Sequence, residues 1–221
     1  MNAGKELTRR GTNYSFSGYN SSCLQCTDYF ARQRIGGNLK RIIVFWDQSN
    51  FQIAVENLMR RDLGGVKAFD YVGFAKALIG SDDLIKVFFA CSAAEDDSQT
   101  AGFFKNIDYH PYFSVKMFER KTVTVAGNVR SAGEKQVDVF LATQIVALAY
   151  ENAYDIAYLV SGDSDFVPAI EIVQQKGKIV IAVSAQEAIS KLLKRKADAF
   201  LLFDDKNDMR MKPYYYHNFV K

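Results

Sequence analysis

Short runs of apolar residues alternate with segments of helical spacing along most of this chain. The apolar runs are nearly continuous, and they lie at about 42–47, 84–92, 113–120, 156–161, 178–184 and 200–203. Strands of this composition are buried on both faces, which is typical of a mostly parallel sheet that helices cover on both sides. The sequence therefore predicts an α/β fold whose sheet has about five or six strands.

Helices are expected between these strands. Asp70 is a favoured helix cap, Pro168 is tolerated in a first helical turn, and Gly177 suits a helix end. A polar, glycine-containing loop or hairpin is expected at 121–135. The expected helices cover about 50–62, 70–78, 95–108, 137–150, 166–175 and 187–197.

The regular pattern covers only part of the chain. Residues 1–38 are rich in Gly, Ser, Asn, Arg and aromatic residues and show no clean period, so we interpret them as an N-terminal extension. One domain is expected at 39–205, and a C-terminal tail at 206–221. With 221 residues, of which 48% are hydrophobic, the chain can fill one sizeable core but not two full domains.

Charge and cysteine content restrict the function only loosely. The formal net charge of +3 is mildly basic and does not by itself indicate nucleic acid. Cys23 and Cys26 have half the spacing of a zinc site, but the other half is missing, so we expect no structural zinc. We expect a reducing compartment, no membrane span and no secretory signal, and therefore a cytoplasmic location.

Four carboxylates fall where a parallel sheet gathers its ligands. Asp47 ends the first predicted strand, Asp163 and Asp165 follow the fourth, and Asp138 falls in the first turn of the helix before the fourth. Ligands of open parallel sheets bind beyond the carboxyl ends of the strands. Acids that meet there repel one another unless a cation offsets the charge. Because such oxygen ligands suit Mg²⁺ or Mn²⁺, we expect metal-assisted hydrolysis of a phosphodiester.

Each acid also has a purely structural interpretation. Asp47 and Asp165 are favoured caps for the helices that follow them. Asp138 would complement the dipole at a helix N-terminus. Only the joint placement of the acids favours a metal site over these roles.

Longer motifs around these residues resemble a known family. The stretches VFWDQSNF, EKQVDVFLATQIV, YLVSGDSDFVPAIEIVQQKGKIVIAV and SKLLKRKADAFLLF together resemble the NYN domain, in its LabA-like branch, within the PIN-like nuclease superfamily. The resemblance covers about residues 40–205. It implies a three-layer α/β/α sandwich with a mostly parallel sheet in the order 3-2-1-4-5.

The resemblance also implies an activity and a site. It implies a ribonuclease that depends on Mg²⁺ or Mn²⁺ and acts on single-stranded or structured RNA through a metal-activated water. Asn50 and Ser161 match family residues that support the acids; Ser161 is expected to be a turn residue rather than a nucleophile, since no histidine accompanies it. The implied catalytic and metal-binding residues are Asp47, Asp138, Asp163 and Asp165.

One position departs from the family. Members often carry an acid six residues after the position of Asp138, where this sequence has the neutral Gln144. A non-catalytic regulatory or RNA-binding protein with the same fold is therefore the alternative. A phosphatase of the haloacid-dehalogenase type is a third class, but it needs a second aspartate two residues after the nucleophile, where Ser49 follows Asp47.

Basic residues surround the predicted loop before the Asp138 helix. Lys116 precedes them, and the residues expected to bind RNA phosphates are Arg120, Lys121, Arg130 and Lys135. Tyr109, Tyr112 and Phe113 offer faces on which bases could stack, although such aromatics more often belong to the core. The expected partner is RNA, no membrane partner is expected, and a homodimer is left open.

Overall fold

The computed structural model describes residues 39–63, 69–79, 82–94, 96–120, 122–125, 128–131 and 134–204. The expected N-terminal extension and C-terminal tail, together with Lys121, Cys23 and Cys26, lie outside the described residues. The elements are, in chain order, β1 (Arg41–Asp47), α2 (Gln48–Leu63), α3 (Tyr71–Ile79), β2 (Asp83–Ala93), α4 (Ser98–Asp108), β3 (Phe113–Glu119), β4 (Thr122–Val125), β5 (Asn128–Ser131), α5 (Glu134–Tyr150), β6 (Ile156–Val160), the 3₁₀ turn η1 (Ser164–Phe166), α6 (Val167–Gln174), β7 (Ile179–Ser184), α7 (Lys191–Lys196) and β8 (Ala199–Leu202).

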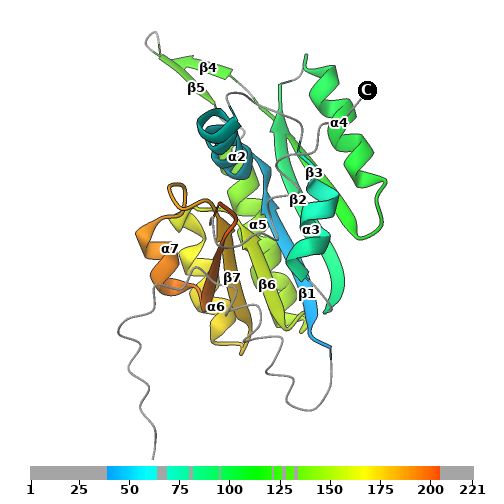
Figure 1. The fold of residues 1–221 in the computed structure, drawn as a ribbon, viewed down its shortest axis with the longest axis vertical. Coiled ribbons are helices and arrows are strands. Elements are labelled where there is room, and N and C mark those ends of the chain that lie inside the picture. The colour runs from blue at the N-terminus through cyan, green and yellow to red at the C-terminus, as the bar shows by residue number, and fades with distance from the viewer. Residues whose placement is uncertain are drawn as a thin grey trace, which may run out of the picture.

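A six-stranded parallel sheet forms the centre of the molecule (Figure 1). Its strand order, β3-β2-β1-β6-β7-β8, confirms the predicted topology, and β8 adds a sixth strand beyond the order 3-2-1-4-5. β4 and β5 form a separate antiparallel hairpin in the segment where a loop or hairpin was expected. In the central strand, Trp46 pairs with Phe89 of β2 on one side and Val160 of β6 on the other.

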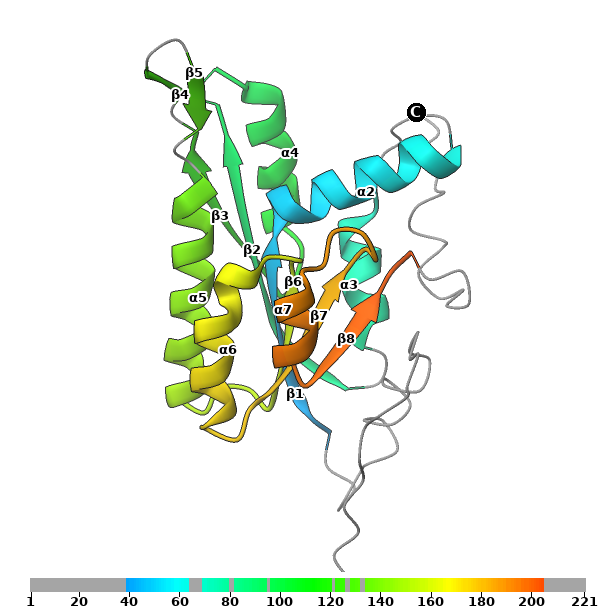
Figure 2. The same ribbon diagram turned by 90° about the vertical axis from the view of Figure 1, so that its left-hand side faces the viewer.

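Helices cover both faces of the sheet, as the buried strands predict (Figure 2). α5, α6 and α7 lie on one face, and α2, α3 and α4 lie on the other. Alternate residues of β1 therefore enter two cores: Trp46 packs with the α2–α4 layer, and Phe45 packs with the α5–α7 layer. A mixed α/β/α sandwich is confirmed.

Aromatic rings fix the end of β1 in place. The ring of Trp46 lies 4.8 Å from Phe51 of α2, 5.5 Å from Phe74 of α3 and 5.4 Å from Phe89 of β2, measured between centroids. Buried aromatic side chains contribute much of the stability of a core because each buries a large apolar area. Their tilted contacts stabilise the fold beyond what this buried area contributes. The cluster therefore anchors α2 and α3 against β1, directly beside Asp47.

Three helices begin three or four residues away from where the sequence predicts. α4 starts at Ser98 instead of 95, because the Asp97 side chain accepts a hydrogen bond from Thr100 N at 2.9 Å and caps the helix. α5 starts at Glu134, so Asp138 lies in its second turn rather than its first. α7 is shorter than the expected 187–197, because Ser190 caps it and accepts a hydrogen bond from Leu193 N at 3.1 Å.

No helix among the described residues combines the length and the apolarity that a bilayer crossing requires.

Candidate functional site

The pairing of β1 with β6 brings Asp47 and Ser161 together. Trp46 and Val160 are register partners, and each is followed by one of these polar residues. Ser161 Oγ donates a hydrogen bond to Asp47 Oδ2 at 3.2 Å, and the Asp47 side chain is only 5% exposed. Neighbouring parallel strands thus place a buried carboxylate at the carboxyl edge of the sheet, where ligands of such folds bind.

Asn50 joins the start of α2 to the turn after β6. Its backbone N–H donates to Asp47 Oδ1 at 3.2 Å, and its side-chain Oδ1 accepts a hydrogen bond from Gly162 N at 2.8 Å. Asp47 therefore caps α2, as its structural interpretation predicts. Asn50 in turn fixes the distance between the acid on β1 and the acids that follow β6.

The turn after β6 is held by its own side chains. Asp163 N donates to Ser161 Oγ at 3.2 Å, and Asp165 N donates to Asp163 Oδ1 at 2.9 Å. Asp163 thus caps the short turn η1, a role that the sequence suggested for Asp165. Ser161 is a hydrogen-bonding turn residue, as expected, since its hydroxyl serves both Asp47 and Asp163.

The environment of Asp47 disfavours its charge. Burial raises the pKa of Asp47 to about 6, the hydrogen bonds from Asn50 and Ser161 oppose the shift, and the nearby charge of Asp163 adds to it. Burial is therefore the main reason why the ionised form of Asp47 is disfavoured, and the charge of Asp163 adds to it. An opposite charge close to a buried carboxylate favours its ionised form.

Asp138 approaches this edge from a different element. α5 runs antiparallel to the strands, so its first turns lie near their carboxyl ends, and the helix packs against η1 (Figure 1). Asp138 lies partly buried in the second turn of α5. Within the described ranges, no three His, Cys, Asp or Glu side chains are placed closely enough to hold a metal ion together. The structure thus links Asp47 to the backbone of Asp163 through the Ser161 hydroxyl and places Asp138 on a helix that reaches the same edge. Asp165 bonds to Asp163 only through its backbone N–H, and its side chain is exposed.

Gln144 lies on a different flank of α5 from Asp138. Six residues turn a helix by about 240°, whereas four residues bring Gln144 onto the flank of Phe140. The neutral residue at this position is therefore separate from the acids of the β1–β6 edge.

Gly162 is a site residue that the sequence analysis missed. A Cβ atom on Gly162 would lie 2.2 Å from the carbonyl oxygen of Ala188 and 2.9 Å from Ser184 Oγ. Gly162 O also accepts a hydrogen bond from Ser190 N at 2.9 Å. The loop before α7 therefore packs directly onto the turn that carries Asp163. A glycine between Ser161 and Asp163 was the available sequence signal.

Three of the four cations predicted to bind RNA are among the described residues, at the carboxyl end of β3, in β5 and in the first turn of α5. Arg120 directly follows β3, and its guanidinium donates to Ser92 Oγ at 3.0 Å and to Ser92 O at 3.2 Å. Arg130 lies in β5 and Lys135 in the first turn of α5. The aromatics considered for stacking lie elsewhere: Tyr109 and Tyr112 precede β3 at the opposite, amino edge, and Phe113 is buried.

The acid pair fits a hard divalent cation. Mg²⁺ is commonly bound through one or two carboxylates while it keeps several waters. Asp47 and Asp163 supply two such carboxylates, and each ionised carboxylate has more lone pairs than its present hydrogen bonds use. The donor set is all oxygen, which suits Mg²⁺ or Mn²⁺ rather than zinc.

Comparison with known proteins identifies a family and a similar fold. A family model described as "NYN domain" matches residues 41–204. A solved structure of a protein of unknown function from Vibrio parahaemolyticus is similar in fold, with a TM-score of 0.57 and 24% sequence identity, over 76% of this chain and 95% of that chain. No curated protein matches the chain.

Proposed function

Because the chain belongs to the NYN domain family, of the PIN-like nuclease superfamily, we propose that it is a divalent-metal-dependent ribonuclease. The proposed reaction is hydrolysis of an RNA phosphodiester bond, and we place the chain in the LabA-like branch. The observation that carries the proposal is the position of buried Asp47 at the carboxyl edge of a parallel sheet, where the Ser161 hydroxyl links it to the turn that carries Asp163.

The proposed metal ligands are Asp47 and Asp163, with Asp138 and Asp165 as further acids at this edge. When bound, Mg²⁺ or Mn²⁺ supplies a water of lowered pKa, which is a hydroxide source near neutral pH. An opposite charge beside Asp47 also favours its ionised form, against the effect of burial. The ion and the ionised acid pair therefore stabilise each other.

Protein groups orient this pair. Ser161 and the backbone N–H of Asn50 each donate to one oxygen of Asp47, which fixes the plane of the carboxylate. Arg120, held by Ser92, is proposed to bind a phosphate oxygen of the RNA and to offset the charge that develops there. Arg130 and Lys135 are proposed to share that task. Preorganised donors of this kind stabilise the transition state because they need not reorient during the reaction.

A cleavage assay with a matched control tests the proposal. Labelled RNA is incubated with Mn²⁺ or with EDTA, beside single-stranded DNA and a generic phosphomonoester. We expect cleavage of RNA that needs the metal, and a loss of more than about 100-fold for Asp163→Asn, which exceeds the usual effect of altering a partner of a metal ligand. Asp83→Asn, an exposed acid at the start of β2, should keep full activity. Activity of Asp163→Asn equal to that of the control would reject the assigned site.

A non-catalytic RNA-binding or regulatory protein is the second candidate. Both oxygens of Asp47 already accept hydrogen bonds, from Asn50 and Ser161, and these stabilise the start of α2 and the turn after β6 without a metal. This candidate predicts RNA binding without cleavage at any Mn²⁺ concentration.

A further inference from the structure

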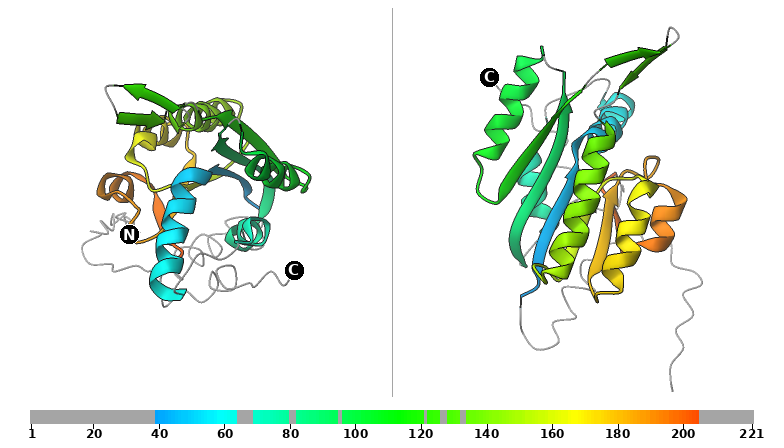
Figure 3. Two further views of the ribbon diagram at one scale, coloured as in Figure 1. Left: turned by 90° about the horizontal axis from the view of Figure 1, so that it is seen from above. Right: turned by 180° about the vertical axis from the view of Figure 1, so that it is seen from behind.

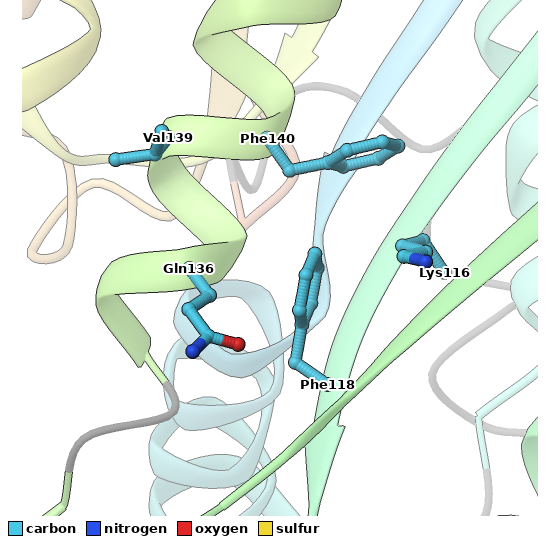
Figure 4. Close-up of a pocket in the computed structure, with 5 residues that line it drawn as sticks. All are labelled: Lys116, Phe118, Gln136, Val139 and Phe140. Carbon is cyan, nitrogen blue, oxygen red and sulfur yellow. The ribbon is translucent and has the colours of Figure 1, made fainter.

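A groove lies between the second half of β3 and the first turns of α5. It has a volume of about 470 Å³ and an almost entirely apolar surface. Two phenyl rings form its base, Phe118 from β3 and Phe140 from α5, with centroids 5.7 Å apart and planes inclined at 62° (Figure 4). Lys116 stands beside them, with Nζ 5.7 Å from the centroid of Phe118, and Gln136 and Val139 flank the groove on α5.

The groove follows from how the layers cover the sheet. α4 packs on one face of the edge strand β3, whereas on the other face α5 lies over β1 and β2 (Figure 3). Phe118 packs with the α5 layer but stays partly exposed, while Val115 packs with the opposite core. The β3 side chains on the α5 side therefore border that helix instead of lying beneath it.

The first turns of α5 separate this groove from the acids. Val137 and Leu141 face the core. At about 100° per residue, Asp138 lies on one flank of that buried stripe and Phe140 lies on the other. An extended polymer bound across the N-terminal end of α5 would contact the acidic edge on one side of the helix and the groove on the other. Arg120 extends the line of Lys116 along β3 toward the same edge.

We propose that the groove binds an unpaired RNA base next to the cleaved phosphate, an inference that rests on the proposed function. Aromatic rings bind the face of any base, which explains an apolar groove without a built pattern of polar groups. Lys116 pairs with a phosphate, and the Gln136 amide offers a donor and an acceptor to the base edge. The bases of a duplex are stacked and cannot enter, so the substrate is single-stranded at this nucleotide.

The ammonium group of Lys116 supports this occupant over an apolar one. An apolar peptide has no anionic group to pair with the ammonium group of Lys116 above the ring of Phe118. A nucleotide uses both features, because its base is aromatic and its phosphate is anionic.

The first test measures binding of a fluorescent, unstructured oligouridine in EDTA, where metal-dependent hydrolysis is absent. Phe118→Leu should weaken binding by about tenfold with an unchanged salt dependence, because it removes stacking and no charge. Lys116→Ala should make the negative slope of log K against log salt smaller in magnitude by about 0.7, the value for one phosphate contact on a single strand. Lys105→Ala, on exposed α4 in the opposite layer, is the matched control and should change neither quantity.

The second test locates the base directly. Iodouridine in the same oligonucleotide is photo-crosslinked to the protein, and the modified peptide is mapped by mass spectrometry. We expect crosslinks in the peptides that carry Phe118 or Phe140, and no effect of Phe118→Leu on binding of a duplex. Three results would each overturn the proposal that the groove binds a base. They are absence of RNA binding, crosslinks confined to other elements, and an affinity of Phe118→Leu equal to that of the wild type.

The two proposals fail in distinguishable ways. Groove crosslinks without cleavage in Mn²⁺ would leave the base site in place and reject the hydrolase. Metal-dependent cleavage with unchanged single-strand binding and cleavage by Phe118→Leu would reject the groove and keep the hydrolase.

Discussion

Asp47 is the residue in which structural and chemical demands meet. It caps α2 and accepts a hydrogen bond from Ser161, yet burial and the charge of Asp163 raise its pKa to about 6. The ionised acid is therefore costly in the metal-free protein. This cost is the physical reason why the site is expected to take up a cation.

The pH dependence of folding should reveal that cost. The pKa of Asp47 rises from 3.8 to about 6 on folding, so between these values the folded state binds more protons than the unfolded state. In EDTA, this residue should therefore make the free energy of unfolding fall as pH rises from about 4 to about 6, by up to about 3 kcal/mol. Denaturant titrations measure the fall, and Asp47→Asn should abolish it. A variant with the same pH profile as the wild type would contradict the assignment.

Gly162 matters to the acidic edge for a steric reason, because there is no room for a side chain at this position. Gly162→Ala forces the new methyl group against the backbone of Ala188, at 2.2 Å from its oxygen, and backbone cannot rotate away. We expect a loss of about 1–3 kcal/mol in the free energy of unfolding, the usual cost of overpacking.

A glycine in open space provides the control for that loss. Gly102→Ala, on the exposed side of α4, meets no atom within 4 Å and should stabilise the protein by about 0.5–1 kcal/mol. Thermal or denaturant unfolding compares the two variants. Equal effects at both positions would show that the contact of Gly162 with the loop before α7 is unimportant.

At the scale of elements, the amino ends of β1 and β6 are joined by a clamp opposite the acids. The Asp155 carboxylate accepts hydrogen bonds from the backbone N of Arg41 at 3.0 Å and from its Nη2 at 2.8 Å. The hydrogen bond from the Arg41 side chain is the main cause that lowers the pKa of Asp155. The stabilisation from this clamp is present above the ordinary aspartate pKa and is lost as pH falls through the lowered value, the reverse of Asp47.

Breaking the clamp should destabilise the sheet without touching the site. Asp155→Ala leaves the Arg41 N–H without its carboxylate, and we expect a loss of about 1–2 kcal/mol in the free energy of unfolding. Glu171→Gln, in the exposed pair with Lys196, is the comparison and should cost less than about 1 kcal/mol. Specific RNA binding should survive in both. A loss for Asp155→Ala no greater than that of the comparison would refute the clamp.

Elements whose position follows from hydrophobic periodicity were predictable from the sequence. Helix starts that depend on a capping residue were less predictable. Each strand of the parallel sheet appears close to its expected place, because nearly continuous apolar runs are typical of strands buried inside such a sheet. The expected start of α7 was wrong because Ser190 caps the helix and its N–H bonds to Gly162, a contact far away in the sequence. Local propensity carries no information about such a contact.

At the scale of the whole molecule, the sheet edge was predictable and the spacing of the acids was not. Strand order places Asp47 beside Ser161, and the sequence motif places Asp163 and Asp165 just beyond. The distance between Asp138 and the other acids depends on the packing of α5 against η1, and no local sequence pattern determines this packing. The groove between β3 and α5 was also beyond the sequence, since it depends on which strand the helix leaves uncovered.

Metal binding should stabilise the whole molecule. A ligand that binds only the native state adds about 2.7 kcal/mol at a hundred times its Kd, so Mg²⁺ or Mn²⁺ should raise the melting temperature. Asp47→Asn and Asp163→Asn should remain folded and lose that increment, whereas Asp83→Asn should keep it. An equal metal response in all four proteins would contradict a cation at the acidic edge.

End-group analysis of the RNA products tests the central claim most directly. Attack by a metal-activated water leaves the RNA 2′-hydroxyl unused, so the account predicts 5′-phosphate and 3′-hydroxyl ends, formed only with Mg²⁺ or Mn²⁺ and lost in Asp163→Asn. Cyclic phosphate ends, or full activity in EDTA, would contradict it.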